Sequence, residues 1–303
     1  MKILLFILLP IILLVTIISE FYLRNLGLGD PIRYDSNILY GYSPKINQKK
    51  NRFKNSTVTI NDFGLRSIYN WKNNKEKKIV FLGDSVTYGG SYIDDKDLFS
   101  HIVCKKLDQF TCGNAGVNSY GVHNTIMRSK YDERIQTADI FVFLFPPDDF
   151  LRDYRNSKTA HFYLNNKKFL LPSITEAISF ISTKYDLNNY ISKLNDTKTK
   201  EDHDLKFIDY SIKLLKEEVE NKKHKNKIVL VLLSNRKDDK FLENKLNKYI
   251  KTKLQEKIDI HLLENYLTDD FFFYDNSVHL SEKGHEVVAE RISSILQKII
   301  QSK

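Results

Sequence analysis

The chain has 303 residues, of which 42% are hydrophobic, and it contains only 11 glycines and 6 prolines. This composition excludes a disordered or fibrous protein, and the length suffices for one sizeable α/β domain with added elements. Lysine and arginine number 47 against 38 acids, a formal net charge of +9. The excess is spread along the chain as lysine among asparagine and isoleucine, without a nucleic-acid motif, so we expect no nucleic-acid partner.

The N-terminal segment is apolar. Ile3–Ile18 carries no charge, and Glu20 and Arg24 follow it. Sixteen helical residues span about 24 Å, slightly less than the ~30 Å hydrocarbon core of a bilayer, and Phe21–Leu23 makes up the difference. We therefore predict a transmembrane helix that contacts the membrane through residues 3–23.

Two kinds of N-terminal helix fit this pattern, an uncleaved anchor and a cleaved signal peptide. A signal peptide requires small residues before the cut, but no alanine occurs before Ala115, and no cysteine stands where a lipoprotein needs one. We therefore favour an uncleaved, single-pass anchor over residues 1–24. Lys2 and the amino terminus are the only positive charges on its short side, and we expect the rest of the chain on the outer side of the cytoplasmic membrane.

Residues 25–75 are polar and rich in tyrosine, asparagine and lysine, with little helical periodicity. Thr57–Ile60 alternates like a short strand, and Asn61–Gly64 has the composition of a turn. We predict a stalk, or N-terminal extension, that packs loosely on the main domain.

The main domain, residues 76–303, alternates short apolar runs with amphipathic stretches. Continuous apolar strands separated by helices indicate a parallel sheet covered on both faces. Helical periodicity occurs at Leu98–Leu107, at Ile208–Val219 and in the final stretch, Glu286–Ile300. Phe169–Leu194 is also apolar at helical spacing, and we expect a helix or two there over the sheet edge. The predicted strands are Lys78–Leu82, Phe110–Ala115, Ile140–Phe145, Ile228–Leu233 and Ile258–Leu263.

The two cysteines, Cys104 and Cys112, form no CxxC motif and no metal-type spacing. The spacing of eight residues places one in a helix and the other in the following strand. A disulfide in an oxidising compartment is one interpretation, and two buried small apolar side chains are the other, which we favour.

A candidate nucleophile follows the first strand of the main domain. The strand runs directly into Gly83-Asp84-Ser85, and a serine at a sharp strand-to-helix turn exposes its hydroxyl at the edge of a doubly wound sheet where ligands bind. Backbone N–H groups at the start of the next helix can stabilise an oxyanion there. The alternative is an ordinary helix N-cap, because Asp and Ser are preferred at that position.

A candidate base lies near the other end of the chain. His279 precedes the final amphipathic helix, in the segment Tyr274–His285. A histidine at this junction can accept the serine proton if a neighbour holds its other nitrogen. Among the eight histidines, only His279 has an acid within one turn and lies on the expected active edge. We expect His285 to be structural.

Over residues 76–300 the sequence resembles the SGNH/GDSL hydrolase family, including its membrane-tethered bacterial members. The resemblance implies that family's fold, a flavodoxin-like, doubly wound, five-stranded parallel sheet. In the extension, Gly29–Pro31 and Ile60–Arg66 also resemble the tethered members. The four matching blocks occur in order, each after the expected strand: Gly83–Ser85, Asn114–Gly121, Phe145–Asp149 and Val278–Leu280.

The resemblance also assigns roles, with three departures. The oxyanion-hole glycine falls at Ser119, where a backbone donor survives beside that of Ser85. The asparagine that donates its side-chain amide falls at Asp148, whose carboxylate must be protonated or turned away. The acid three residues before the histidine is Asn276, so either Asp275 takes over, or Asn276 orients the imidazole without its charge, or the site is a dyad.

The leading hypothesis is hydrolysis of carboxylic esters through an acyl-enzyme, with Ser85 as nucleophile and His279 as base. No metal and no organic cofactor is required. With the anchor, the resemblance implies an O-acyl group on an envelope glycan, or a lipid ester, as substrate. Two alternatives stay open: O-acyl transfer to a sugar hydroxyl, and a non-catalytic glycan-binding or assembly protein that keeps the fold.

Overall fold

The computed structural model describes residues 2–72, 77–152, 169–182, 200–222, 227–233, 240–254, 260–263, 269–272 and 279–301. A five-stranded parallel sheet of order β6-β5-β7-β8-β9 forms its centre. The chain enters at β5, adds β6 on one side and then β7, β8 and β9 on the other, which is the flavodoxin-like order. The predicted fold class is therefore confirmed. The strands are β5 (Lys77–Gly83), β6 (Phe110–Asn114), β7 (Ile140–Phe145), β8 (Lys227–Leu232) and β9 (Ile260–Leu262).

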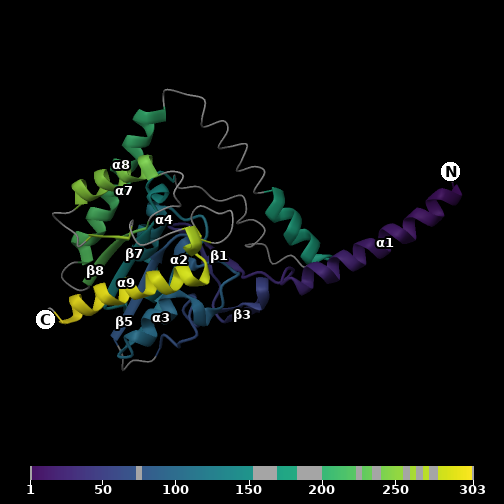
Figure 1. Cartoon of the computed structure of the whole chain (residues 1–303), viewed down its shortest axis with the longest axis horizontal. Helices are drawn as coiled ribbons and strands as arrows, with labels where there is room; N and C mark the ends of the chain where they lie inside the picture. The colour runs from purple at the N-terminus through teal and green to yellow at the C-terminus, as the bar shows by residue number, and fades with distance from the viewer. Residues whose placement is uncertain are drawn as a thin grey trace.

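Helices cover both faces of this sheet, as Figure 1 shows. Alternate strand residues point to opposite faces, so Ile79 and Phe81 pack with α3 (Phe99–Lys106) and α9 (Glu282–Gln301). Val80 and Leu82 pack on the other face with the three remaining long helices of this domain. A strand buried on both faces must be apolar at every position, which explains the continuous runs in the sequence. The three helices are α4 (Val122–Tyr131), α7 (Lys200–Lys222) and α8 (Lys240–Leu254).

The predicted strands agree with the structure to within a few residues, whereas α7 (Lys200–Lys222) begins eight residues before the predicted helix Ile208–Val219. All five strands occur where the apolar runs predict them, and Leu98–Leu107 corresponds to α3. The last helix begins four residues earlier than predicted, at Glu282, because Ser281 Oγ accepts a hydrogen bond from Gly284 N (3.2 Å) and caps it. The short helical turns are α2 (Ser85–Tyr88), η1 (Phe53–Asn55), η2 (Asp95–Asp97), η3 (Glu133–Ile135), η4 (Pro147–Phe150) and η6 (Asp269–Phe271).

The N-terminal extension forms two antiparallel hairpins, and the predicted strand Thr57–Ile60 is one of their strands. Tyr34 and Tyr42 are buried in a cluster with Tyr88 and Tyr120 of the main domain. The expectation of loose packing is therefore wrong for this part of the chain. Its buried apolar side chains occur singly among polar ones, so they produce no periodic signal. The strands are β1 (Tyr34–Asn37), β2 (Gly41–Pro44), β3 (Gln48–Asn51) and β4 (Thr57–Ile60).

Arg66 joins the extension to the sheet. Its backbone N–H donates to Asn114 O (2.8 Å), next to the edge strand β6. Its fully buried guanidinium pairs with Asp95 (Nε to Oδ1, 3.1 Å) and donates to three carbonyls of residues 88–93. Removing one partner of a buried charge pair costs on the order of 3–5 kcal/mol, so this residue is a principal constraint on the loop after α2.

The N-terminal helix α1 (Lys2–Asn25) extends away from the rest of the molecule (Figure 1). Its stretch Leu8–Asn25 has a mean hydropathy of 1.6 and is long and apolar enough to cross a membrane. A signal sequence has the same properties, so the prediction of an anchor stays a prediction.

The helix of residues 172–182 lies at the inner end of α1 (Figure 1). Its hydrogen bonds to the rest of the described chain reach residues 20–52, not the sheet edge. The expected position over the sheet edge is therefore wrong for this helix, while residues 183–194 lie outside the described residues. Two buried carboxylates fix the position of this helix. Glu20 of α1 accepts hydrogen bonds from its first N–H groups, and Glu176 within it forms an ion pair with Arg52.

The cysteines match the interpretation that we favoured. Cys104 lies in α3 and Cys112 in β6, and both are buried free thiols. Cys112 N donates to Cys104 Sγ at 3.1 Å, and burial raises the pKa of the Cys112 thiol well above its ordinary value. A protonated, buried thiol of this kind is chemically inert.

Candidate active site

Ser85 stands at the carboxyl edge of the sheet because β5 turns directly into α2. A Cβ on Gly83 would lie 2.2 Å from Thr87 Oγ1 and 2.3 Å from Leu144 O, so only glycine permits this turn. Asp84 Oδ1 then accepts from Val86 N (2.8 Å) and caps α2. The N-cap in this turn is thus Asp84 and not Ser85, whose hydroxyl itself donates to Asp84 Oδ2 (3.3 Å).

His279 meets Ser85 across 194 positions of sequence. Its Nε2 lies 2.9 Å from Ser85 Oγ, within hydrogen-bonding distance. The loop before α9 is held by Tyr92, whose hydroxyl donates to Leu280 O (3.1 Å), and by Ser281 N, which donates to Phe271 O (2.8 Å). A serine hydroxyl in this contact with a histidine nitrogen can lose its proton to that nitrogen.

The second histidine of this region, His285, is structural, as expected. It is fully buried, stacks on Phe99 and accepts a hydrogen bond from Phe99 N at its Nδ1 (3.4 Å). Burial lowers its pKa to about 3. His285 is therefore neutral at pH 7 and packs under Gly89, where a Cβ would lie 3.1 Å from its ring.

Arg152 is a site residue that the sequence analysis missed. Its Nη1 donates to Asp84 Oδ2 (3.1 Å) and Tyr120 O (3.0 Å), and lies 3.1 Å from Asp149 Oδ1 as an ion pair. These partners belong to the three blocks that follow β5, β6 and β7, so one guanidinium ties them together. Asp84 and Asp149 are both fully buried, and two buried carboxylates require a cation. In the sequence, the need of these two carboxylates for a nearby cation was the one signal that could have pointed to Arg152.

The second block packs closely on α2. A Cβ on Gly116 would lie 2.3 Å from Tyr88 N, so the backbones touch there. Ser119 has φ +65°, the left-handed conformation that glycine adopts without cost. The structure therefore gives a physical reason for a glycine at this position in the resembling family. A serine keeps the same N–H at a conformational cost of about 1–2 kcal/mol.

The remaining predicted site residues are only partly described. Asp148 lies in η4, directly after β7, at the same edge as Ser85, and its side chain is outside the described part of the structure. Asp275 and Asn276, the candidates for holding His279, also lie outside the described residues. Their roles stay predictions.

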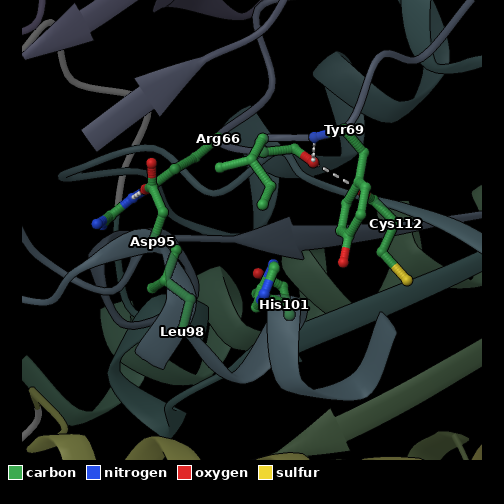
Figure 2. A pocket seen from close by; sticks show the side chains of 9 residues that line it. Arg66, Tyr69, Asp95, Leu98, His101 and Cys112 are labelled. Atoms are coloured by element: carbon green, nitrogen blue, oxygen red, sulfur yellow. Dashed lines mark hydrogen bonds and ion pairs between the residues drawn. The ribbon is translucent and has the colours of Figure 1, made fainter. Parts of the chain in front are cut away.

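No group of three or more metal-ligating side chains is found within the described ranges. A small pocket lies elsewhere, lined by residues that include Arg66, Tyr69, His101 and Cys112 (Figure 2). It has room for about one water molecule, and neither Ser85 nor His279 lines it. We therefore assign it no role in substrate binding.

The surroundings of His279 keep its imidazole neutral. Burial lowers its pKa below the ordinary 6.5; the negative charge of Asp84 raises it, and the positive charge of Arg152 lowers it. A neutral imidazole at pH 7 can accept a proton, which an imidazolium cannot. Electrostatics and geometry are therefore both compatible with a general base.

No protein-family model matches the chain, and no curated protein matches it by sequence. Solved structures similar to it include a member of the lipolytic G-D-S-L family from Veillonella parvula, at 14% identity and a TM-score of 0.47, covering 73% of this chain and 98% of that one. They also include a lipase/acylhydrolase from Enterococcus faecalis, at 15% identity and a TM-score of 0.45, covering 73% and 96%.

A third similar structure is a catalytic mutant of an acetylxylan esterase from Geobacillus stearothermophilus, at 15% identity and a TM-score of 0.45, covering 71% of this chain and 91% of that one. At these values the likeness adds no argument about chemistry. The fold assignment depends on the strand order of the sheet, and the chemistry on the residues around Ser85.

Replacing Arg152 tests the electrostatics of this site. In the native protein, the rate at which a fluorophosphonate reacts with Ser85 should rise with pH around a midpoint below 6.5, because only neutral His279 accepts the proton. Arg152→Met removes the cation that lowers the pKa of His279 while Asp84 remains, so the midpoint should move up. Arg152→Lys keeps the charge and is the matched control. An unchanged or lower midpoint in Arg152→Met, with the fold intact, contradicts this account.

Proposed function

We propose that the protein is a serine hydrolase that cleaves carboxylic esters through an acyl-enzyme. The observation that carries this proposal is the 2.9 Å contact between Ser85 Oγ and His279 Nε2 at the carboxyl edge of the sheet. A nucleophile and a base in this contact are the minimum apparatus for acyl transfer to serine.

In the first half of the reaction, Ser85 Oγ attacks the ester carbonyl carbon as His279 Nε2 takes its proton. The tetrahedral intermediate collapses when the C–O bond to the alcohol breaks and His279 returns the proton to the leaving oxygen. Water repeats the sequence on the acyl-enzyme and releases the carboxylic acid. The neutral imidazole, which burial and Arg152 favour, is the form that this cycle needs.

The backbone N–H groups of Ser85 and Ser119 are the donors that we assign to the oxyanion. The left-handed conformation of Ser119 supports this assignment, because it is the conformation that a glycine at the same position adopts readily. An ionised Asp148 would repel the developing negative charge. We therefore infer that Asp148 is protonated or directed away during catalysis, while Arg152 compensates the carboxylates of Asp84 and Asp149.

The proposed substrate is an O-acyl group on an envelope glycan, or a lipid ester. Support for it comes from α1, which is apolar over a length that can cross a bilayer and would keep the site near the membrane. We propose a single-pass anchor with the domain on the outer side of the cytoplasmic membrane. Assays of ester hydrolysis with a soluble acetylated glycan and with a lipid ester distinguish these two substrate classes.

Protease treatment of spheroplasts tests the orientation. If the domain lies outside, external protease should degrade it in intact spheroplasts, because no membrane shields it. The intensity of the full-length band measures the result, and a cytoplasmic protein that stays intact is the control. If the domain is protected until the spheroplasts are lysed, it lies on the cytoplasmic side. If the mature protein lacks residues 1–24, the N-terminal helix is a signal peptide and not an anchor.

Ser85→Ala tests the nucleophile. It should abolish hydrolysis of short acyl esters and labelling by a fluorophosphonate, because the covalent step needs the hydroxyl oxygen. The melting temperature should stay close to that of the wild type, since the Asp84 cap of α2 remains. Appreciable hydrolysis by the variant would refute the assignment. A wild-type protein that neither labels nor hydrolyses any ester would favour a non-catalytic role.

Substitutions at Asp275 and Asn276 test the third member of the site. If Asp275 supports His279, Asp275→Asn should lower kcat by about two powers of ten or more at pH 7 with KM nearly unchanged, because imidazolium is stabilised in the transition state. If Asn276 orients the ring, Asp275→Asn should be nearly silent and Asn276→Ala damaging. Asn276→Asp should then raise kcat. Equal kcat for all three variants and the wild type would leave a Ser85–His279 dyad.

A further inference from the structure

The helix of residues 172–182 buries its polar side and exposes its apolar side. Ser173 and Glu176 are 0% and 3% exposed, whereas Ile178 and Ile181 on the other side are 61% and 66% exposed. Amphipathic helices of soluble domains show the opposite arrangement, with the apolar stripe towards the core. This helix therefore presents an apolar surface to its surroundings.

Three isoleucines form one stripe along the helix. Ile174, Ile178 and Ile181 follow one another at intervals of four and three residues, which places them on one side of the helix. Ile174 is half-buried, and Ile178 and Ile181 are exposed. We call these three side chains the apolar stripe. Leu170, directly before the helix, is 95% exposed, and Phe180 is exposed on another side of the last turn.

Hydrogen bonds and charges fix the polar side to the protein. The Glu20 carboxylate of α1 accepts from Ser173 N (3.1 Å) and Ile174 N (3.0 Å), the first N–H groups of the helix. Glu176 forms a buried ion pair with Arg52 and accepts from Gly29 N (2.6 Å). Negative charge at a helix N-terminus is stabilising. The outward direction of the stripe is therefore a consequence of specific buried contacts.

These contacts place the helix at the end of the candidate span. Glu20 comes two residues after the uncharged run Ile3–Ile18, a distance of about 3 Å along a helix axis. A bilayer that contains this run has its headgroups at the level of Glu20 and Ser173. Figure 1 shows the helix crossing the inner end of α1 rather than continuing it.

A second exposed group lies at the same level. The β3–β4 turn contacts the end of α1, since a Cβ on Gly27 would lie 2.7 Å from Phe53 N. Phe53 is 41% exposed, and the cations Lys54, next to it, and Arg24, in the last turn of α1, are exposed. Aromatic and basic side chains of this kind are typical of the headgroup region of a membrane.

We propose that residues 169–182 form an interfacial helix whose apolar stripe inserts into the surface of the bilayer that α1 spans. Together with the β3–β4 turn, it gives the domain contacts beside the anchor and so sets the direction in which the domain stands on the membrane. The proposal goes beyond the proposed hydrolase function. It depends on the proposed anchoring of α1 and not on the chemistry of Ser85.

Quenching of a tryptophan by brominated lipid tests this contact. The full chain carries Ile178→Trp and is reconstituted in phosphatidylcholine–phosphatidylglycerol vesicles with or without bromine on the acyl chains. The native Trp71 is fully buried, so the wild-type protein supplies the background. Bromolipid should cause a large loss of emission from the introduced tryptophan, because indole at an interfacial helix lies against the acyl chains.

The matched control is Tyr210→Trp, a similarly exposed aromatic position in α7, which Figure 1 shows on the side of the molecule away from α1. Its emission should not change with bromolipid. Equal, weak quenching of both variants overturns the proposal. Emission from the Ile178→Trp variant that is shifted to the blue, insensitive to bromolipid and dependent on protein concentration also overturns it, in favour of a second copy covering the stripe.

Fluorophosphonate labelling of Ser85 in the same vesicles separates this proposal from the proposed function. Quenching without labelling supports the interfacial helix and counts against the hydrolase. Labelling without quenching supports the hydrolase and counts against the interfacial helix. Recovery of the protein in solution, outside the vesicles, overturns the anchor and the interfacial helix together and leaves the chemistry of Ser85 untouched.

Discussion

The buried Arg66 guanidinium is the interaction on which the arrangement of this protein depends most. It neutralises Asp95, satisfies three carbonyls in the loop after α2, and through its backbone extends the sheet from β6 to β4. Because a buried charge cannot be left unpaired, the extension and the loop that follows α2 must adopt their positions together. The extension is consequently a part of the main domain, and it connects α1 to the region around Ser85.

Charge compensation also organises the candidate site. Asp84 and Asp149 are fully buried beside Ser85, and Arg152 pairs with both and with the carbonyl of Tyr120. The same cation lies close enough to lower the pKa of His279. One residue therefore holds three loops together and helps to keep His279 neutral.

Charge compensation also organises the part of the molecule at the inner end of α1, but there it leaves an apolar surface exposed. Glu20 and Glu176 are buried against a helix N-terminus and Arg52. Satisfying these carboxylates requires the polar side of residues 172–182 to face the protein, and the apolar stripe is then left outside. A surface of this kind is stable next to lipid and costly in water. The proposed anchor and the proposed interfacial helix are thus held together by the carboxylate of Glu20.

The sequence by itself determined the class of fold and the two central residues of the site. Strands buried on both faces must be continuously apolar, and parallel strands bring their carboxyl ends to one edge, so the five strands, Ser85 and His279 were all predictable. The tertiary structure alone decided the tight packing of the extension, the position of residues 172–182 and the part played by Arg152. Those features depend on pairs such as Asp84 with Arg152 and Arg52 with Glu176. A charge pair between residues far apart leaves no periodic trace in the sequence, because its partners are brought together only when the chain has folded.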